Sequence, residues 1–346
     1  MPLYSSDLLF QQAKTTPPGR RIAVAIAVCL AVLLLALALR GISWLEVWTT
    51  IRQVKGVNLL AAFGMTALAL LMRSLRWRNL LAAQKRLPLS DTFLATTTGY
   101  LGNTFLPARA GEVIRSVALA KRSGISAAFI FATALTERVL DAIVLIITGL
   151  VLLPGMTSFP AQQKPLLWII AALGILVLAF LLLLPFFEQP SLRLLSRLRL
   201  PNKWNTRLEP LVTQFIAGSR AFLQPGRSIA FLLYTALIWL LDGLGAVILA
   251  GGMDLPLGLT QALFLLVSLG LASALPSTPG YVGLYQYTAE TVLPLFGITR
   301  SQALAYILVL QSVFVIVVLA LGLAGIFRLG LKTSPGQGQS RFPPQA

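Results

Sequence analysis

The sequence predicts an all-α integral membrane protein, with six to eight transmembrane helices and two broken or re-entrant hairpin segments in an inverted-repeat arrangement. Three observations favour this fold class. Of the 346 residues, 57% are hydrophobic and 11% are charged, whereas soluble domains carry about 25% charged residues. The apolar residues form long runs, which are typical of helices that cross a bilayer. One segment broken by proline and glycine occurs in each half of the chain.

The apolar runs predict the membrane segments in order along the chain. A hydrocarbon core of about 30 Å needs roughly 20 apolar residues, and each predicted span reaches or approaches that length. Full spans are predicted at 22–39, 57–72, 126–153, 166–187, 228–250 and 303–327. Polar or interrupted segments are predicted at 91–106, 258–275 and 281–296. The first run is longer than the core of a signal peptide, so we expect a retained helix.

Basic residues set the predicted orientation, because cytoplasmic segments of membrane proteins are rich in Lys and Arg. Most of the 28 Lys and Arg lie in five segments, 1–21, 73–90, 107–125, 188–227 and the C-terminal tail. These segments share one side only if 91–122 enters the membrane and returns. We therefore expect both termini in the cytoplasm of a cell (inner) membrane protein. Charge does not decide whether 258–296 also re-enters, which gives six spans, or crosses twice, which gives eight.

The predicted organisation is a cytoplasmic N-terminus at 1–21, one polytopic membrane domain at 22–329 and a disordered cytoplasmic tail at 330–346. The tail is rich in Gly, Pro and Gln, a composition that does not bury a core. Within the domain, the predicted connector is 188–227, where residues 191–223 alternate leucines with arginines and contain two prolines, Pro201 and Pro210. This pattern indicates an amphipathic connector on the anionic leaflet.

The composition excludes several function classes. The chain has no histidine and a single cysteine, Cys29. It therefore lacks Ser-His-Asp and Cys-His nucleophile arrangements and His-containing zinc sites, and we expect neither a metal nor a cofactor. The net charge of +17 follows the predicted topology rather than forming one patch, so we expect no nucleic acid as a partner.

The two broken segments share the frame Leu-Pro-x-x-x-Gly, at 106–111 and at 275–280. Proline removes a backbone donor and glycine permits a turn. The freed backbone groups are costly in hydrocarbon, so such a break survives where it is buried in protein or lines a wet cavity. Paired breaks in corresponding places indicate the site of an inverted-repeat transporter. The alternative is a pair of proline kinks in ordinary helices.

A charged cluster interrupts the run at 126–153. An ionisable group at the bilayer centre costs roughly 2.5–3.5 kcal/mol, so it needs a partner, a cavity or a proton. Glu137 and Asp141 share a helical face, and Arg138 lies three residues before Asp141. The cluster has one negative charge in excess, and Arg109 or Arg115 is the expected additional partner.

Arg109, Glu112 and Arg115 are spaced by three residues and lie along one predicted helical face. In the functional interpretation, they and the cluster at 137–141 form a polar chamber for a lipid headgroup, with Arg109 and Arg115 meeting phosphate. The alternative is an ion-pair lock that holds a hairpin to its neighbouring span. The two interpretations are compatible.

Asp242 and Glu290 have no nearby cation in the sequence. We expect such lone membrane carboxylates to be largely protonated. Asp242 lies beside Gly243 and Gly245, and we interpret it as a silent, hydrogen-bonded acid at a packing face. For Glu290, a silent role and proton coupling both stay open.

Three motifs together resemble the lysylphosphatidylglycerol synthase transmembrane region, also called the flippase-like domain family. They are G-N-x-x-L-P-x-R-x-G-E at 102–112, E-R-x-x-D at 137–141 and P-S-T-P-G-x-x-G at 276–283. The resemblance extends over roughly 20–330. It implies an inner-membrane protein that moves a lipid, which is an aminoacylated phosphatidylglycerol in the best-known members and a glycolipid, polyprenyl-phosphate or hopanoid lipid in others.

Two departures from the family pattern stand out. The chain ends soon after its last predicted span, so we expect a stand-alone member without the soluble synthase domain. The family usually has Glu at the position of Gln286, and Glu290 lies one helical turn further on the same face. The candidate substrate-binding residues, from the charges and the resemblance together, are Asn103, Arg109, Glu112, Arg115, Glu137, Arg138, Asp141, Pro276, Ser277, Thr278, Pro279, Gly280, Gln286 and Glu290.

The leading hypothesis is a lipid transporter or flippase that moves an anionic or lipid-phosphate-linked substrate. Its partners are then membrane lipids of the phospholipid, aminoacyl-phospholipid or polyprenyl-phosphate type. One alternative is an integral-membrane transferase that uses a lipid-phosphate donor, although the sequence has no paired-Asp metal motif and no phosphate-binding glycine loop. The other is an accessory scaffold for a lipid-modifying synthase.

Overall fold

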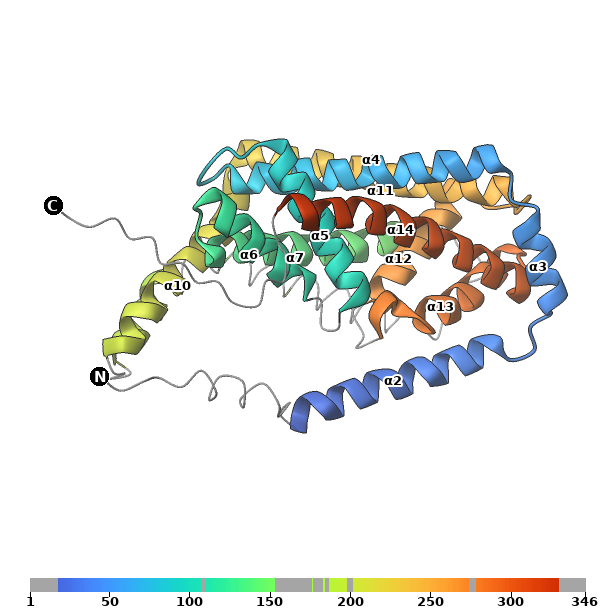
Figure 1. Cartoon of the computed structure of the whole chain (residues 1–346), viewed down its shortest axis with the longest axis horizontal. Coiled ribbons are helices and arrows are strands. Elements are labelled where there is room, and N and C mark those ends of the chain that lie inside the picture. The colour runs from blue at the N-terminus through green and yellow to red at the C-terminus, as the bar shows by residue number, and fades with distance from the viewer. Residues whose placement is uncertain are drawn as a thin grey trace.

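The computed structural model of the chain is an elongated bundle of helices (Figure 1). It describes residues 18–106, 110–152, 187–197, 202–273 and 278–329, together with the single positions 176 and 183. Every element within these ranges is helical. The predictions for the first 17 residues, for nearly all of the span at 166–187 and for the tail at 330–346 lie outside the described residues.

The helices follow one another with short connections. They are α2 (Pro18–Leu39), α3 (Trp44–Arg52), α4 (Gly56–Leu81), α5 (Leu89–Phe105), α6 (Gly111–Ser123), α7 (Ala127–Leu152), α9 (Glu188–Arg197), α10 (Asn202–Arg220), α11 (Pro225–Gly252), α12 (Leu259–Ala272), α13 (Leu284–Val292) and α14 (Arg300–Arg328). Short 3-10 turns are η5 (Ala221–Leu223), η6 (Pro279–Tyr281) and η7 (Leu293–Phe296). The apolar runs at 126–153, 228–250 and 303–327 thus each form one helix.

Three of the described helices, α4, α11 and α14, are long and apolar enough to cross a membrane. A fourth candidate is the last part of α2, Val28–Leu39, taken together with α3. The two helices form a span only if a bend of 88° between them is accepted. The 14 residues of α12 reach about 21 Å, which is short of the hydrocarbon core. By length and composition, the described part of the chain therefore supports three or four spans, and the predicted number of six to eight stays a prediction.

Helix α4 is longer than the sequence predicts. The apolar run ends at 72, but the helix continues to Leu81 and carries Arg73 and Arg76. Arginine is a good helix former, and both side chains meet carboxylates on other helices. The first part of the predicted basic segment 73–90 is therefore helical and packed in the bundle, and the side of the membrane that the segment faces stays a prediction.

Helices α5 and α6 form a hairpin whose open end lies beside the C-terminal end of α14. Asp91 near the start of α5 pairs with Arg122 near the end of α6, at 2.9 Å. Arg122 also donates to the carbonyl of Arg328 at 3.3 Å. The two helices touch through their backbones, because a Cβ atom on Gly111 would lie 1.9 Å from the carbonyl oxygen of Gly99.

Helices α12 and α13 form a second hairpin, whose open end lies beside the N-terminal end of α14. Glu290 in α13 pairs with Arg300, the first residue of α14, at 2.9 Å. At the bend, Gly280 accepts a hydrogen bond from Gln311 of α14. A Cβ atom on Gly280 would lie 3.7 Å from the carbonyl oxygen of Thr104 in α5. The two hairpins thus open toward opposite ends of one 29-residue helix, and their bends meet between those ends (Figure 1).

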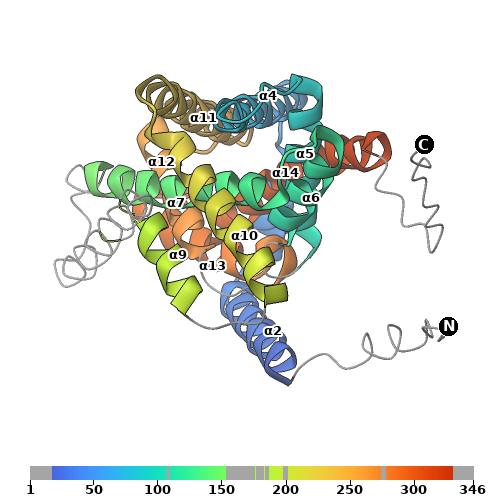
Figure 2. The same cartoon turned by 90° about the vertical axis from the view of Figure 1, so that its left-hand side faces the viewer.

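Helices α4 and α11 lie side by side along the bundle (Figure 1). The expectation that Gly243 and Gly245 lie at a packing face is confirmed. A Cβ atom on Gly245 would lie 3.2 Å from Met65 of α4, and one on Gly243 would lie 2.9 Å from Leu259 of α12. The view from one end of the bundle shows α9 and α10 across that end (Figure 2).

Candidate functional site

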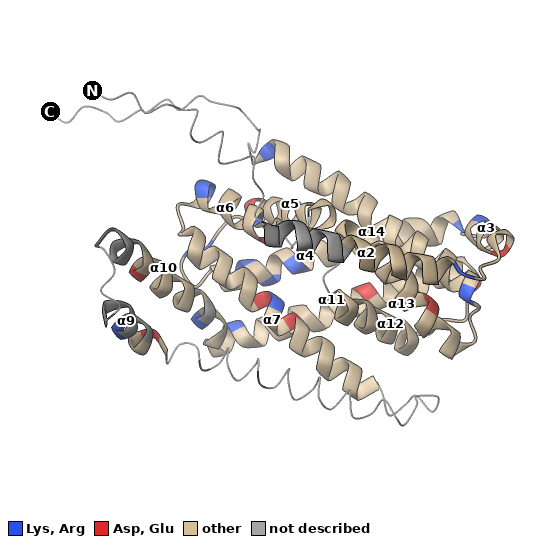
Figure 3. Cartoon of the chain, turned by 90° about the horizontal axis from the view of Figure 1, so that it is seen from below, with Lys and Arg blue, Asp and Glu red and all other residues tan. Residues whose placement is uncertain are grey.

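Acidic and basic residues lie on helices along the length of the bundle as well as at its ends (Figure 3). The largest group joins three helices, α4, α6 and α7, in a closed cycle of six ion pairs with alternating charges. We call this group the charge ring. In order around the cycle, its members are Arg76, Glu137, Arg115, Glu112, Arg138 and Asp141.

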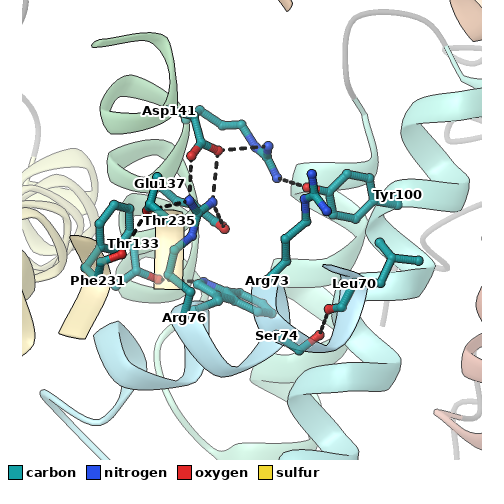
Figure 4. Close-up of polar contacts among 12 residues, drawn as sticks. Leu70, Arg73, Ser74, Arg76, Tyr100, Thr133, Glu137, Asp141, Phe231 and Thr235 are labelled. Atoms are coloured by element: carbon teal, nitrogen blue, oxygen red, sulfur yellow. Dashed lines mark hydrogen bonds and ion pairs between the residues drawn. The ribbon is translucent and has the colours of Figure 1, made fainter. Parts of the chain in front are cut away.

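The deeply buried half of the charge ring is centred on Glu137. Arg76 donates to Oε1 of Glu137 at 2.7 Å, and Arg115 donates to Oε2 at 2.9 Å. The side chains of all three are 1–2% exposed. Arg76 also donates to Asp141 at 2.6 Å and to the hydroxyl of Thr235 on α11 at 3.0 Å. Figure 4 shows these contacts around Arg76.

Aromatic rings cover the two buried arginines. The guanidinium of Arg115 lies 4.3 Å from the ring centroid of Trp77, and that of Arg76 lies 4.7 Å from Phe231. Trp77 donates its indole N–H to the hydroxyl of Thr133 at 3.1 Å. The two rings and the low exposure of the arginines shield this half of the charge ring from solvent. Cation–π contacts are strongest where water is excluded.

The other half of the charge ring is accessible. Arg138 lies 2.8 Å from Glu112 and 3.4 Å from Asp141, and the side chains of Arg138 and Asp141 are 21% and 22% exposed. Beside it, Arg73 pairs with Asp242 at 2.5 Å, with 17% and 25% exposure. The ring of Tyr100 lies 5.3 Å from the Arg138 guanidinium and 5.8 Å from that of Arg73. We call Arg73, Arg138, Asp141 and Asp242 the outer layer.

Both groups are balanced in charge. The charge ring has three arginines and three carboxylates, each with two partners, and the Arg73–Asp242 pair adds one of each. An unpaired charge in such a place is costly. A charged ligand that enters must therefore exchange with an existing ion pair, and only the outer layer is open to it. Within the described residues, no group of three or more His, Cys, Asp or Glu is arranged to hold a metal ion.

The structure brings together most of the charged candidates from the sequence. Glu137 meets Arg115, one of its two expected partners. The other, Arg109, lies outside the described residues, as do Pro276 and Ser277. Asn103 donates its amide to Glu112 at 3.2 Å.

Arg73 and Arg76 are the contributors that sequence reasoning missed. Their signal in the sequence is a pair of arginines three apart, directly after an apolar run and within helix-forming residues. This pattern is compatible with a buried helical face as well as with a basic loop. Their acidic partners come from α7 and α11.

The candidates of the second frame lie at the bend of the α12–α13 hairpin. Thr278, Pro279 and Gly280 form the turn that approaches α5. Gln286 is buried, accepts from the backbone N–H of Gly283 at 2.7 Å and donates to Gln311 at 2.8 Å. Gln286 thus ties the bend to α14.

The expectation that Asp242 and Glu290 lack cations is wrong. Asp242 pairs with Arg73, which is 169 residues away in the sequence. Glu290 has a carboxylate that is 2% exposed and pairs with Arg300. Helix packing supplies both arginines, so neither acid is the lone carboxylate that local sequence suggested. Glu290 also has a different partner from Gln286, which argues against a simple exchange of roles.

An apolar cavity of about 490 Å³ lies on the hairpin between α5, α6 and α14. Its wall includes Leu101, Phe105, Ile114, Leu319 and Leu323. Tyr100 and Asn103, which contact the charge ring, lie on α5 beside the cavity residues Leu101 and Gly102. Helix α5 therefore both lines the apolar cavity and makes polar contacts with the charge ring.

Comparisons with known proteins find similarity to one family model and to relatives that are membrane proteins. A family model described as the lysylphosphatidylglycerol synthase TM region matches residues 22–322. A UPF0104 membrane protein of Methanocaldococcus jannaschii is 27% identical over 213 residues, which cover 61% of this chain and 86% of the relative. A second, from Methanothermobacter thermautotrophicus, is 29% identical over 315 residues, which cover 83% and 90%. No solved structure matches the chain.

Proposed function

The chain belongs to the lysylphosphatidylglycerol synthase TM-region family of membrane proteins, and from this premise we propose that it moves a lipid with an anionic or phosphate-linked headgroup across the cytoplasmic membrane. The observation that carries the proposal is the balanced charge ring with an accessible outer layer, inside a bundle of apolar helices. Intramembrane charges are rare and are typical of substrate pathways. A purely structural bundle has no need for four ion-paired groups open to a ligand.

In the proposed mechanism, the buried half of the charge ring holds the helices together and the outer layer binds the headgroup. Arg138 is the residue that meets phosphate, because its guanidinium donates in a planar fork. A phosphate that binds Arg138 displaces the carboxylates of Glu112 and Asp141 from it. Glu112 then stays paired with Arg115, and Asp141 stays paired with Arg76. The exchange therefore leaves no carboxylate without a partner, which lowers the cost of binding and release.

We further propose that the two hairpins re-enter the membrane from opposite sides. Their open ends at opposite ends of α14 and their meeting bends support an inverted repeat. The apolar cavity at α5, α6 and α14 supports a path on which the acyl chains stay in a hydrocarbon environment. This arrangement gives six full spans, with α5–α6 entering from the cytoplasm.

Cysteine labelling tests this topology. In a Cys29→Ser background, Lys85→Cys and Lys121→Cys are expected to react with a membrane-impermeant maleimide only after cells are opened, because both flank the first hairpin on its cytoplasmic side. Asp254→Cys is expected to react in intact cells. All three positions are exposed. Labelling of Lys85→Cys and Lys121→Cys from opposite sides would mean that the first hairpin crosses the membrane.

Lipid movement itself is tested with Arg138→Gln. Loss of one charge-assisted hydrogen bond to phosphate costs about 1.5–3 kcal/mol, so we expect transbilayer movement to slow by roughly ten- to a hundred-fold. The measurement is the dithionite-accessible fraction of fluorescent phosphatidylglycerol, and in parallel of a fluorescent polyprenyl phosphate, in proteoliposomes.

The matched control is Arg52→Gln, which removes an exposed arginine on α3 and is expected to leave the rate unchanged. Melting temperatures of both variants separate a loss of binding from a loss of fold. Equal rates for wild type, Arg138→Gln and protein-free liposomes with every labelled lipid would refute the proposal.

A further inference from the structure

A second polar cavity lies away from the charge ring, at the end of the bundle where α4 ends and α11 begins. Its volume is about 250 Å³. Its polar lining comes from two parts of the chain that are distant in sequence, position 84 and the stretch 214–227. These residues are Gln84, Gln214, Arg220, Gln224 and Arg227. None of the described lining residues is acidic.

The walls of this cavity are fixed by close packing. Helix α10 lies against α7 at Gly218, where a Cβ atom would come within 2.5 Å of Ala132 and 2.8 Å of the carbonyl oxygen of Phe129. Ala221, at the turn after α10, is buried. Phe222 packs edge to face on Phe231 of α11, with ring centroids 5.4 Å apart. The cavity is therefore part of the folded structure and does not depend on a loose surface loop.

Arg227 is held at the cavity wall with part of its guanidinium unused. Its Nη2 donates to the carbonyl of Ala82 at 3.1 Å, and its own carbonyl accepts from Asn79 at 2.9 Å. Its Nη1 is buried and makes no hydrogen bond to any described residue. The side-chain oxygen of Gln214 is also buried and accepts no hydrogen bond from any described residue. Buried polar groups are normally satisfied, so these two atoms indicate a ligand or ordered water.

We propose that this cavity binds a phosphate group, in addition to the lipid site at the outer layer. Arg227 supplies charge-assisted donors, and the Gln214 amide can turn its NH₂ group toward a phosphate oxygen. Arg220 at the rim is half exposed and already pairs with Glu188 at 2.7 Å, so the proposal depends on the charge of Arg227. The cavity holds several times the volume of one water, which is about 30 Å³. A lipid headgroup and a free phosphate ester share this chemistry.

The test uses the full chain in nanodiscs of phosphatidylcholine at constant ionic strength. In one arm, inorganic phosphate is titrated, and in the other, the nanodiscs contain about 20% phosphatidylglycerol. The readout is the melting temperature together with titration calorimetry. Binding of inorganic phosphate identifies a free phosphate ligand, and stabilisation in the phosphatidylglycerol arm alone identifies a lipid headgroup.

Three variants locate the binding. Arg227→Gln removes the charge, and Ala217→Phe fills the cavity without a change in charge, since Ala217 lines it. Lys121→Gln is the matched control, because it removes an exposed positive charge outside the cavity but at the same end of the bundle. We expect the first two to weaken the apparent affinity about tenfold and the control to match wild type.

Two outcomes would overturn the proposal. Equal affinity in all four proteins would mean that phosphate binds outside this cavity, at the outer layer or by general surface charge. No saturable binding in either arm would mean that the cavity holds water only. Ala217→Phe keeps the test decisive if Arg227→Gln does not fold.

Discussion

Arg76→Leu is expected to destabilise the folded protein by about 3–5 kcal/mol, the cost of breaking a buried ion pair from one side. Arg76 is 2% exposed at its side chain and lies between Glu137 and Asp141 in the charge ring. Each acid keeps one other arginine, but the charge ring then has one negative charge in excess, and Glu137, which is 1% exposed, is screened poorly. The removed guanidinium also leaves Thr235 and the face of Phe231 without their contacts.

The measurement is a melting curve in detergent micelles, with the yield of monodisperse protein as a second readout. The double variant Arg76→Leu with Glu137→Gln restores the balance of charge, because two arginines and two carboxylates remain. These four residues still form a chain of ion pairs from Arg115 to Asp141. We expect it to recover part of the lost stability, which is the coupling that a double-mutant cycle isolates.

An exposed ion pair provides the control for this prediction. Lys55 and Asp254 lie 2.6 Å apart with side chains that are 54% and 63% exposed. Lys55→Gln is expected to cost at most about 1 kcal/mol, because water screens exposed pairs. If Arg76→Leu melts at the same temperature as Lys55→Gln, the charge ring does not hold the helices together.

Gly111→Ala is expected to disrupt the α5–α6 hairpin and abolish lipid movement. The added Cβ atom would lie 1.9 Å from the carbonyl oxygen of Gly99, 2.6 Å from Oδ1 of Asn103 and 2.7 Å from its backbone nitrogen. Two of these atoms belong to the backbone, so no side-chain rotation relieves the clash, and the helices must separate. The separation moves Glu112 and Arg115 away from their partners on α7, and overpacking alone costs about 1–3 kcal/mol.

Gly64→Ala is the matched control. Gly64 lies within α4, and an added Cβ atom meets nothing within 4 Å. Alanine is the better helix former by about 1 kcal/mol, so this variant is expected to melt at or above the wild-type temperature. Both variants are assayed for melting temperature and for movement of labelled lipid. A Gly111→Ala protein that moves lipid at the wild-type rate would show that the close approach of the two helices is dispensable.

Much of the helical framework could be predicted because it depends on local properties of the chain. An apolar run and a spacing of three or four residues are visible within a few turns. The helices at 127–152 and 300–328 therefore agree with the predicted runs to within a few residues. The end of α4 was missed because hydropathy falls at Arg73, although the helix continues.

The candidate site could be predicted only in part, for a reason that concerns distance along the chain. The cluster of Glu137, Arg138 and Asp141 is local and was visible as charge within an apolar run. Arg76 lies 61 residues from Glu137, and Arg73 lies 169 residues from Asp242. No periodicity in the sequence links such positions, so their pairing could not be assigned without the packing of α4 against α7 and α11.

The sequence alone determined that this is a helical membrane protein of a recognisable family with charge inside its apolar segments, because these properties follow from composition, local spacing and short motifs. Only the tertiary structure decided that the charges close into a balanced ring, that Asp242 and Glu290 have arginine partners, and that Arg138 is accessible while Glu137 is sealed. The reason is physical. Ion pairing and solvent access depend on which helix faces meet, and that is set by packing of the whole bundle, including backbone contacts such as the one between Gly99 and Gly111.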